Sequence, residues 1–249
     1  MGSGRTKPAL FGCEDKDGNG SGEFVVKFKG GLETGVDGLT CELISSLVAD
    51  DLGIASPSPA LIEIDAAIAR FIPESDADVA TVIRKSEGAN FGTQVLVGGF
   101  PTWPTDKAIP AGLLQAATEV FAFDALIQNP DRRYDNPNLL WRDEEVFVID
   151  HDSAFSFLYA LGNQSSPWNL ERAHFLEQHV FYRPLKGRFT EVERFMGALE
   201  AMSDDKISNI AEAVPLEWRT DKLPRIVRHL KLLRDHARDF AEQVKRRLV

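Results

Sequence analysis

The sequence predicts an α+β fold with a small β-rich N-terminal part and a mainly helical C-terminal part. In the first 65 residues, short apolar runs alternate with polar, glycine-containing segments, a pattern typical of antiparallel strands. In residues 111–128, and in most of the chain beyond residue 188, apolar side chains instead recur at the spacing of an α-helix. The 249 residues suffice for one large domain or for two lobes that share a cleft.

The N-terminal part is expected to contain three strands and one helix. Glycine and asparagine in the polar run 14–22 favour a turn between the first two strands. Asp37 and Gly53 are predicted to cap the helix at its two ends. The strands are predicted at Pro8–Cys13, Glu23–Lys29 and Ala60–Ile64, and the helix at Leu39–Leu52.

A boundary between the two parts is expected near residue 98. Thr93–Val97 is predicted as a further short strand, and the glycine pair and prolines of Gly98–Pro110 interrupt the pattern after it. The predicted lobes are therefore residues 1–98 and 99–249.

Two helices stand out in the C-terminal part. Ala111–Gln128 has a strong helical pattern. Lys222–Leu248 is predicted as one long helix, whose apolar stripe either packs on the core of the protein or forms the seam of a coiled coil.

Composition excludes several classes of function. A formal net charge of −10 opposes broad electrostatic binding to nucleic acid or to an anionic membrane. No run of about 18 apolar residues predicts a membrane span, and the first residues lack the apolar core of a secretion signal. Cys13 and Cys41 show no metal-binding spacing and are interpreted as two buried thiols in a reducing compartment. Together these observations predict a cytoplasmic protein and leave its oligomeric state open.

The segment Asn129–Phe157 carries the clearest chemical pattern. Two apolar runs, 138–141 and 146–149, are joined by a polar turn and predict a β-hairpin. If Trp141 faces Val146, then Asn138 faces Ile149, and Asp150 lies one residue from the level of Asn136. An amide oxygen and a carboxylate at one end of a hairpin suit Mg²⁺, which binds few protein oxygens and retains positions for water and phosphate.

Asp131 lies just upstream as a third polar group that can orient or deprotonate a hydroxyl. Asp131, Asp135 and Asn136 are also common turn formers, which is the alternative interpretation of this spacing. Asp150 favours the metal site, because an acid that ends an apolar strand is held in a fixed place.

A second group of residues lies in the N-terminal part. Lys27 interrupts an apolar strand and must find a partner or reach a cleft, and Glu42 on the following helix can provide that partner. Residues 2–7 precede the first strand, and their small side chains allow backbone N–H groups to approach phosphate. Glycines at 2–4 also occur as remnants of an expression tag.

In this order, the strand lysine, the helix glutamate, the D-x4-N loop, the hairpin and the terminal aspartate resemble the protein-kinase-like fold. The runs DRRYDN and VIDHDSAF are more similar to phosphoinositide kinases, and most similar to HipA-like kinases. SGRTKPALF resembles the glycine loop of that family, and FVVKF resembles its lysine strand. GLTCELISSLVADDLGIASPSPALIEID resembles its helix, proline turn and next strand. The resemblance covers about residues 1–65 and 111–157. The resemblance implies a bilobal kinase fold.

The resemblance also implies roles for individual residues. Lys27 would hold the α- and β-phosphates of ATP and pair with Glu42, while Asp131 would be the catalytic base. Asn136 and Asp150 would hold Mg²⁺. The phosphates would be covered by the glycine loop, which includes Gly2, Ser3, Gly4 and Lys7. The adenine-facing hinge would comprise Val95, Leu96 and Val97. The roles of His151 and Asp152 stay open.

The implied activity is ATP- and Mg²⁺-dependent transfer of phosphate to a Ser or Thr hydroxyl of a protein, with autophosphorylation as one outcome. The alternatives are a kinase of an inositol lipid or small metabolite, and a nucleotide-binding regulator without turnover. The acceptor itself is not identified by the sequence. Trp168, His174, His179 and Tyr182 are candidates for the acceptor side of the cleft.

Overall fold

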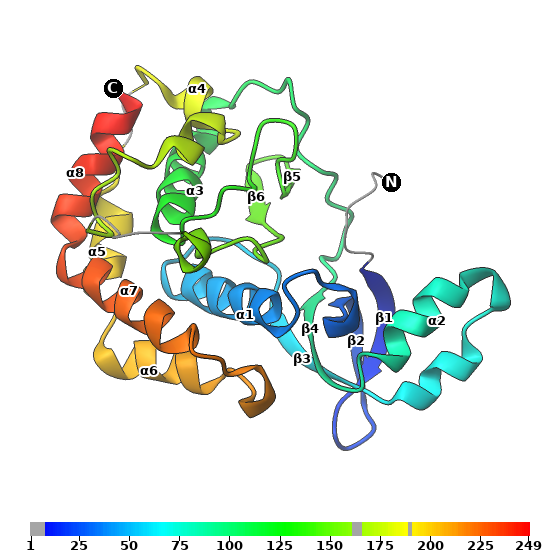
Figure 1. Cartoon of the computed structure of the whole chain (residues 1–249). Coiled ribbons are helices and arrows are strands. Elements are labelled where there is room, and N and C mark those ends of the chain that lie inside the picture. The colour runs from blue at the N-terminus through cyan, green and yellow to red at the C-terminus, as the bar shows by residue number, and fades with distance from the viewer. Residues whose placement is uncertain (1–7, 161–165, 189–190) are drawn as a thin grey trace.

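The computed structural model describes residues 8–160, 166–188 and 191–249. A small antiparallel sheet forms the N-terminal part and helices make up most of the remainder (Figure 1), so the α+β prediction is confirmed. Four of the predicted phosphate-loop residues, Gly2, Ser3, Gly4 and Lys7, lie outside the described residues.

The N-terminal sheet has the strand order β1-β2-β4-β3, and all three pairings are antiparallel. Its strands are β1 (Ala9–Glu14), β2 (Gly20–Lys27), β3 (Pro59–Ile64) and β4 (Gly88–Gln94). Phe24 and Val26 of β2 are buried in a small core with the short helix α2 (Ala77–Arg84), and Lys27 belongs to the alternate face of the strand. The first three predicted strands are confirmed to within a few residues.

The fourth predicted strand, Thr93–Val97, was placed too late. Strand β4 ends at Gln94, which lies opposite Phe24 of β2, one residue beyond the pairing of Thr93 with Pro59 of β3. Val95 retains one backbone hydrogen bond, from its N–H to the carbonyl of Glu23. Val97 is 92% exposed.

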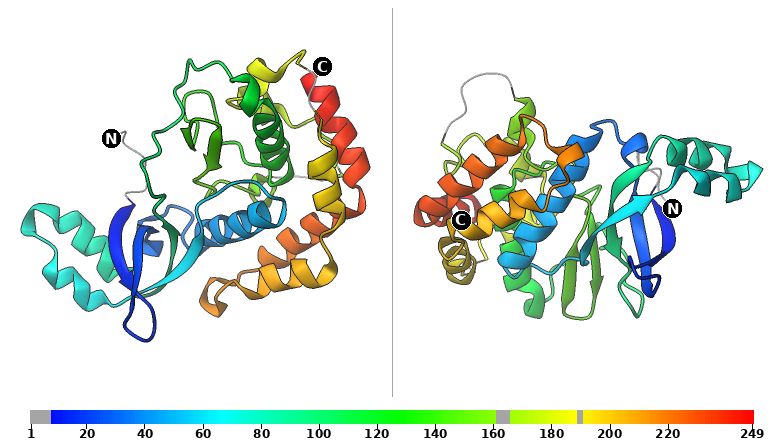
Figure 2. Two further views of the ribbon diagram at one scale, coloured as in Figure 1. Left: turned by 180° about the vertical axis from the view of Figure 1, so that it is seen from behind. Right: turned by 90° about the horizontal axis from the view of Figure 1, so that it is seen from below.

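Helix α1 (Val36–Asp51) lies between the sheet and the C-terminal helices, as Figures 1 and 2 show. Eleven of its sixteen residues are buried, so it is enclosed on almost all sides. The predicted cap was wrong at one end. Gly35 precedes the helix with φ +56°, whereas the Asp37 carboxylate accepts hydrogen bonds from Thr220 and Lys222. At the other end, Gly53 follows the helix with φ +69°, as expected of a C-terminal glycine.

The predicted hairpin is present in the predicted register. Strands β5 (Leu139–Arg142) and β6 (Glu145–Val148) pair with Trp141 opposite Val146, and Ile149 donates its backbone N–H to the carbonyl of Asn138 at 3.1 Å. Helix α3 (Leu114–Leu126) precedes this segment, within the predicted range, and ten of its residues are buried. The register brings Asp150 back to the beginning of the hairpin.

The predicted single C-terminal helix is two helices. Helix α7 (Leu223–Asp235) ends and α8 (Ala237–Leu248) begins at His236, which has φ −119°. The His236 ring stacks on Trp168 with their centroids 3.5 Å apart. Both apolar faces pack in the main core, so the stripe is internal packing and no coiled-coil seam. The remaining helices of the described chain are α4 (Tyr182–Leu185), α5 (Glu193–Glu200) and α6 (Asp204–Glu212).

The short helical turn Leu216–Trp218 connects the C-terminal helices to the N-terminal part. The buried Trp218 indole donates its Nε1–H to the carbonyl of Ala89 at 3.3 Å, and Thr40 of α1 donates its hydroxyl to the Trp218 carbonyl. Glu217 accepts hydrogen bonds from the Ala89 N–H and from Lys29, each at 3.2 Å. The position of α1 therefore depends on a segment about 180 residues further along the chain.

Both cysteines are free thiols, but only Cys41 is buried, and Cys13 on β1 is half-buried. The prediction of two buried thiols was therefore wrong for Cys13, whose strand lies at the edge of the sheet. Among the described residues, no helix combines the length and apolarity that crossing a membrane requires.

Candidate active site

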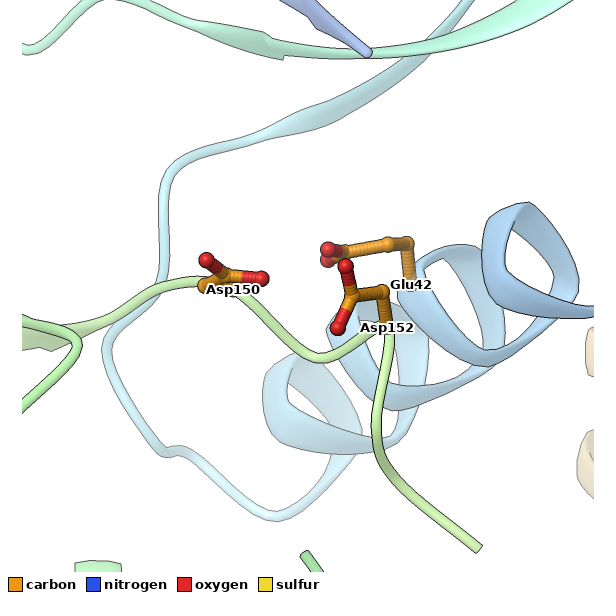
Figure 3. A group of neighbouring side chains, drawn as sticks. All are labelled: Glu42, Asp150 and Asp152. Carbon is orange, nitrogen blue, oxygen red and sulfur yellow. The ribbon is translucent and has the colours of Figure 1, made fainter. Parts of the chain in front are cut away.

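Lys27 lies at the centre of a cluster of acids where the two parts of the molecule meet. Its ammonium group donates hydrogen bonds to Oε1 of Glu42 and, at 2.6 Å, to Oδ1 of Asp150, and it lies 4.0 Å from Oδ2 of Asp152. Figure 3 shows the three carboxylates turned toward one another, one from α1 and two from the segment after β6. The predicted contact between Lys27 and Glu42 is thus present.

The local sequence explains this geometry. Alternation along β2 buries Phe24 and Val26 and leaves Lys27 on the opposite face. Asp150 adopts φ +61°, a left-handed conformation that Asp tolerates better than most residues, at the point where the chain leaves the hairpin. The other lysine of the run, Lys29, lies beyond the strand and contacts Glu217.

The cluster has one cation and three carboxylates. Burial would lower the pKa of Lys27, but Glu42, Asp150 and Asp152 outweigh burial and raise it, so the ammonium stays charged. Burial raises the pKa of Glu42 to about 7, against the opposing effect of Lys27. Burial also raises the pKa of Asp152. The pKa of Asp150 is lowered, because contact with Lys27 outweighs its burial. An additional cation would relieve the remaining negative charge.

Asp131 lies in the loop that joins α3 to the hairpin. Its Oδ2 accepts hydrogen bonds from the side-chain amides of Asn136, at 2.8 Å, and Asn138, at 3.0 Å. Burial raises the pKa of Asp131, and the negative charge of Asp150 adds to the effect, which also indicates that the two carboxylates are neighbours. The predicted residues Asp131 and Asn136 are therefore in direct contact.

These donors fit a magnesium ion. Asn136 uses its NH₂ group to contact Asp131, and within the described chain its amide oxygen accepts no hydrogen bond. Asp150 and Asp152 are 33% and 21% exposed, so water and a ligand can reach them. Glu42, Asp150 and Asp152 present oxygens within 4.8 Å of one another, but Glu42 is buried, so Asp150 and Asp152 are the acids that an ion with bound water can reach. Carboxylate and amide oxygens that water can reach are the kinds of ligand that Mg²⁺ prefers.

A second, fully buried network lies beneath the Asp131 loop. The Arg132 guanidinium donates to Asp124 of α3 at 2.5 Å, to the carbonyl of Asn138, and to the carbonyl of Ile149 at 3.0 Å. Its Nη2 lies 3.2 Å from Nδ1 of His151. Arg132 directly follows Asp131 in the sequence, and it contacts the carbonyl of Ile149, the residue before Asp150. This contact fixes the two carboxylates relative to each other.

Asp124 completes this network. It also contacts His179 Nε2 at 2.9 Å and the side-chain amide of Asn129 at 3.1 Å. Arg132 and His179 outweigh the effect of burial and lower the pKa of Asp124 to about 2. Burial lowers the pKa of His151 to about 3, so this histidine is neutral. The sequence left the role of His151 open, and the structure shows it as a buried neighbour of Arg132.

Sequence reasoning missed Asp124, Arg132 and Asn138. An isolated Asp within the apolar helix 120–126 was an available signal, because a buried acid requires a partner. No comparable signal identified Arg132, which is one of two adjacent arginines.

The residues predicted to form the adenine-facing hinge make no such contacts within the described chain. Val95 and Leu96 are half-buried and Val97 is exposed, and no hydrogen bond of the three reaches the Lys27 cluster.

Comparisons with known proteins give the family of this chain. A family model described as "HipA-like kinase" matches residues 1–245. A crystal structure of a Helicobacter pylori proinflammatory kinase CtkA is similar with a TM-score of 0.48 and 13% sequence identity, covering 98% of this chain and 96% of that chain. No curated protein matches the sequence. Because the family model covers nearly the whole chain, the protein belongs to the HipA-like kinase family.

Proposed function

We propose that this protein transfers the γ-phosphoryl group of ATP, with Mg²⁺, to a Ser or Thr hydroxyl of a protein acceptor. The observation that carries the proposal is that Lys27 contacts Asp150 at 2.6 Å, while Asn138 links the hairpin end before Asp150 to Asp131. One cation and two acids, one of them a proposed metal ligand, are thereby held in one region. Phosphoryl transfer needs these three elements, because its catalysis consists mainly of positioning and charge stabilisation.

Lys27 is the proposed contact to the α- and β-phosphates. The Glu42 carboxylate, fixed on the enclosed helix α1, holds the ammonium in place. Asp150 shares the same ammonium, so nucleotide phosphates compete with an acid for Lys27. This arrangement keeps the lysine charged and oriented before ATP binds.

Asn136 and Asp150 are the proposed ligands of Mg²⁺, and Asp152 is an additional acid beside them. When bound, the ion supplies positive charge to the β- and γ-phosphate oxygens. Asn136 also orients Asp131, because its NH₂ group donates to that carboxylate. One amide thereby connects the proposed metal site to the proposed base.

Asp131 is the proposed base for the acceptor hydroxyl. Two amides occupy its Oδ2, while among the described residues its Oδ1 has only a 3.9 Å contact with Arg133 and can accept the hydroxyl proton. The hydroxyl oxygen then forms the new bond to the γ-phosphorus, the bond to the bridging oxygen of ADP breaks, and ADP leaves. The raised pKa of Asp131 makes the carboxylate a better proton acceptor. Val95–Val97 remain the proposed adenine contact.

Asp131→Asn tests the proposal. In wild-type protein incubated with ATP and Mg²⁺, we expect ADP formation and a mass increase of one phosphate by intact mass spectrometry. Asp131→Asn should reduce both at least ~1,000-fold while retaining the thermal shift caused by Mg²⁺ and a non-hydrolysable ATP analogue. Asp143→Asn is the matched control, because Asp143 is an exposed acid in the hairpin turn.

Two results would contradict the proposal in different ways. Unchanged phosphate transfer in Asp131→Asn would remove the assigned role of Asp131. A nucleotide-dependent thermal shift in wild-type protein without ADP or phosphoprotein would instead support a nucleotide-binding regulator without turnover.

A further inference from the structure

A groove runs beside the Asp131 loop, on a side that the proposed nucleotide site does not use. It consists of two adjoining hollows of about 620 Å³ and about 350 Å³, which share Tyr134, Val180 and Pro184 as lining residues. The larger hollow lies within the size range of ligand sites. None of Lys27, Glu42 and Asp150 lines either hollow.

One wall of the groove is the proposed catalytic loop itself. Residues 133–135 line the larger hollow, and they lie in the sequence between Asp131 and Asn136. The facing wall is held to this loop by the backbone, since the Val180 N–H donates to the Arg132 carbonyl at 3.1 Å and Arg133 forms a β-bridge with His179. A chain bound in the groove would therefore lie next to the proposed base.

The groove offers cations that lack acidic partners. Arg183 and Arg188 are exposed and line the larger and the smaller hollow respectively, and neither forms an ion pair within the described chain. Lys107, in the smaller hollow, contacts no carboxylate among the described residues. Its ammonium lies 3.8 Å from the centroid of the Trp141 ring.

The acids of the same walls already have partners. Arg133 lies 3.2 Å from Asp135, Arg247 lies 3.3 Å from Glu177, and the Tyr134 hydroxyl donates to Asp106 at 2.5 Å. The lining thus has four cationic and three acidic side chains, a small positive excess in a chain whose net charge is −10. Because the surface as a whole repels acids, this local excess of cations is selective.

We propose that the groove binds the acceptor protein as an extended acidic segment, with the acceptor Ser or Thr at the Asp131 end. Carboxylates of the segment pair with Arg183 and Arg188, and its backbone and apolar atoms lie against the half-exposed Tyr134 ring and Pro184. Two hollows in sequence favour a chain over a compact metabolite. This inference rests on the proposed function and adds the class of acceptor.

Peptide binding tests the groove without requiring turnover. The probes are two fluorescein-labelled peptides, each with one serine, flanked on both sides by three glutamates in one peptide and by three lysines in the other. Fluorescence anisotropy at low salt should show the acidic peptide binding at least ~10-fold more tightly, and added salt should weaken it. Arg183→Glu with Arg188→Glu should remove that preference.

The control is Arg228→Glu, which makes the same change of charge at an exposed arginine of α7 outside the groove lining. It should retain the preference. Arg183→Gln with Arg188→Gln should lose most of the affinity for the acidic peptide without gaining affinity for the basic one. Equal binding of both peptides to wild-type protein, or an equal loss in Arg228→Glu, would overturn the inference.

ADP formation without peptide separates this inference from the proposed function. The double arginine variants should form ADP at the wild-type rate, because neither arginine contacts Lys27, Asp150 or Asp131. Wild-type turnover together with equal peptide affinities would reject the groove and leave the kinase proposal intact. Arginine-dependent binding of the acidic peptide without any Asp131-dependent turnover would reject the kinase proposal and leave the groove.

Discussion

Two clusters of charged residues lie on either side of the segment 149–152, and they differ in composition and in exposure. The cluster around Lys27 has one cation and three carboxylates, two of which reach solvent. The cluster around Arg132 has one guanidinium, one carboxylate and two histidines with lowered pKa values, and all four side chains are buried.

From this difference we expect the Lys27 cluster to bind a ligand and the Arg132 cluster to stabilise the fold. The Arg132 cluster is electrically balanced, and breaking such a pair costs stability because the remaining charge is buried. The Lys27 cluster keeps an excess of negative charge, which disfavours the protein without ligand and favours a cation with its nucleotide. Substitutions should therefore affect activity at one cluster and stability at the other.

The largest effect is expected from Asp150→Asn. It should lower ATP turnover about 10⁴-fold, equivalent to ~5.5 kcal/mol of transition-state stabilisation, because the variant loses a proposed ligand of Mg²⁺. The free energy of unfolding should change by less than ~1 kcal/mol, because Lys27 keeps Glu42 as a partner and relief of the repulsion from Glu42 and Asp152 offsets part of the lost ion pair. Initial rates and urea unfolding measure the two quantities. Asp143→Asn, also at positive φ, should change neither, and a large stability loss in Asp150→Asn would remove the contrast.

Asp124→Ala should show the opposite pattern. Removing this acid leaves Arg132 charged and buried without its partner, which should reduce the free energy of unfolding by about 3–5 kcal/mol. Urea unfolding and the melting temperature measure the loss. Asp204→Ala is the control, because Asp204 pairs with Arg234 and Lys231 at the surface and should cost at most ~1 kcal/mol. Equal losses in the two variants would show that the Arg132 network does not support the fold.

A smaller effect is expected from pH. Burial lowers the pKa of His229 to about 4, while its ordinary value is about 6.5. As pH falls from about 6.5 to about 4, the unfolded chain binds a proton that the folded chain refuses, so the fold loses ~3 kcal/mol from this residue. His229→Gln, which keeps a donor for the Leu126 carbonyl, should flatten this part of the stability profile.

The raised pKa of Glu42 acts with the opposite sign. Between about pH 4.5 and 7 the unfolded chain releases a proton that folded Glu42 retains, so its contribution to stability is lost as pH rises. As the pH rises toward 7, the free energy of unfolding of Glu42→Gln should therefore increase relative to that of the wild type. Parallel profiles for wild type and both variants would mean that neither group titrates differently in the folded and unfolded chains.

The sequence predicted features that depend on local pattern and missed those set by distant packing. The hairpin register followed from two apolar runs and one turn, and it placed Asp150 near the Asp131 loop. Lys27 was identified because a lysine in an apolar strand needs a partner. The Arg132 network was not predicted, because its partners come from α3, the hairpin ends and residue 179.

The predicted boundaries of two elements were wrong for the same reason. The apolar stripe of residues 222–248 continues through His236 without interruption, and the break is accompanied by stacking on Trp168 from elsewhere in the chain. Strand β4 stops at Gln94, where its pairing with β2 and β3 ends, although the residue pattern continues. Such limits depend on which segments meet, which one-dimensional periodicity does not encode.

The contact between Trp218 and the N-terminal part has a consequence for synthesis on the ribosome. Glu42 of α1 is synthesised 176 residues before Trp218. At ~5–20 residues per second, Trp218 is therefore added about 9–35 s later. During that time α1, which is buried on most sides in the final structure, has only part of its surroundings. The nascent chain therefore exposes apolar surface from its first helix until translation is nearly finished, and this interval is when a chaperone has the most to bind.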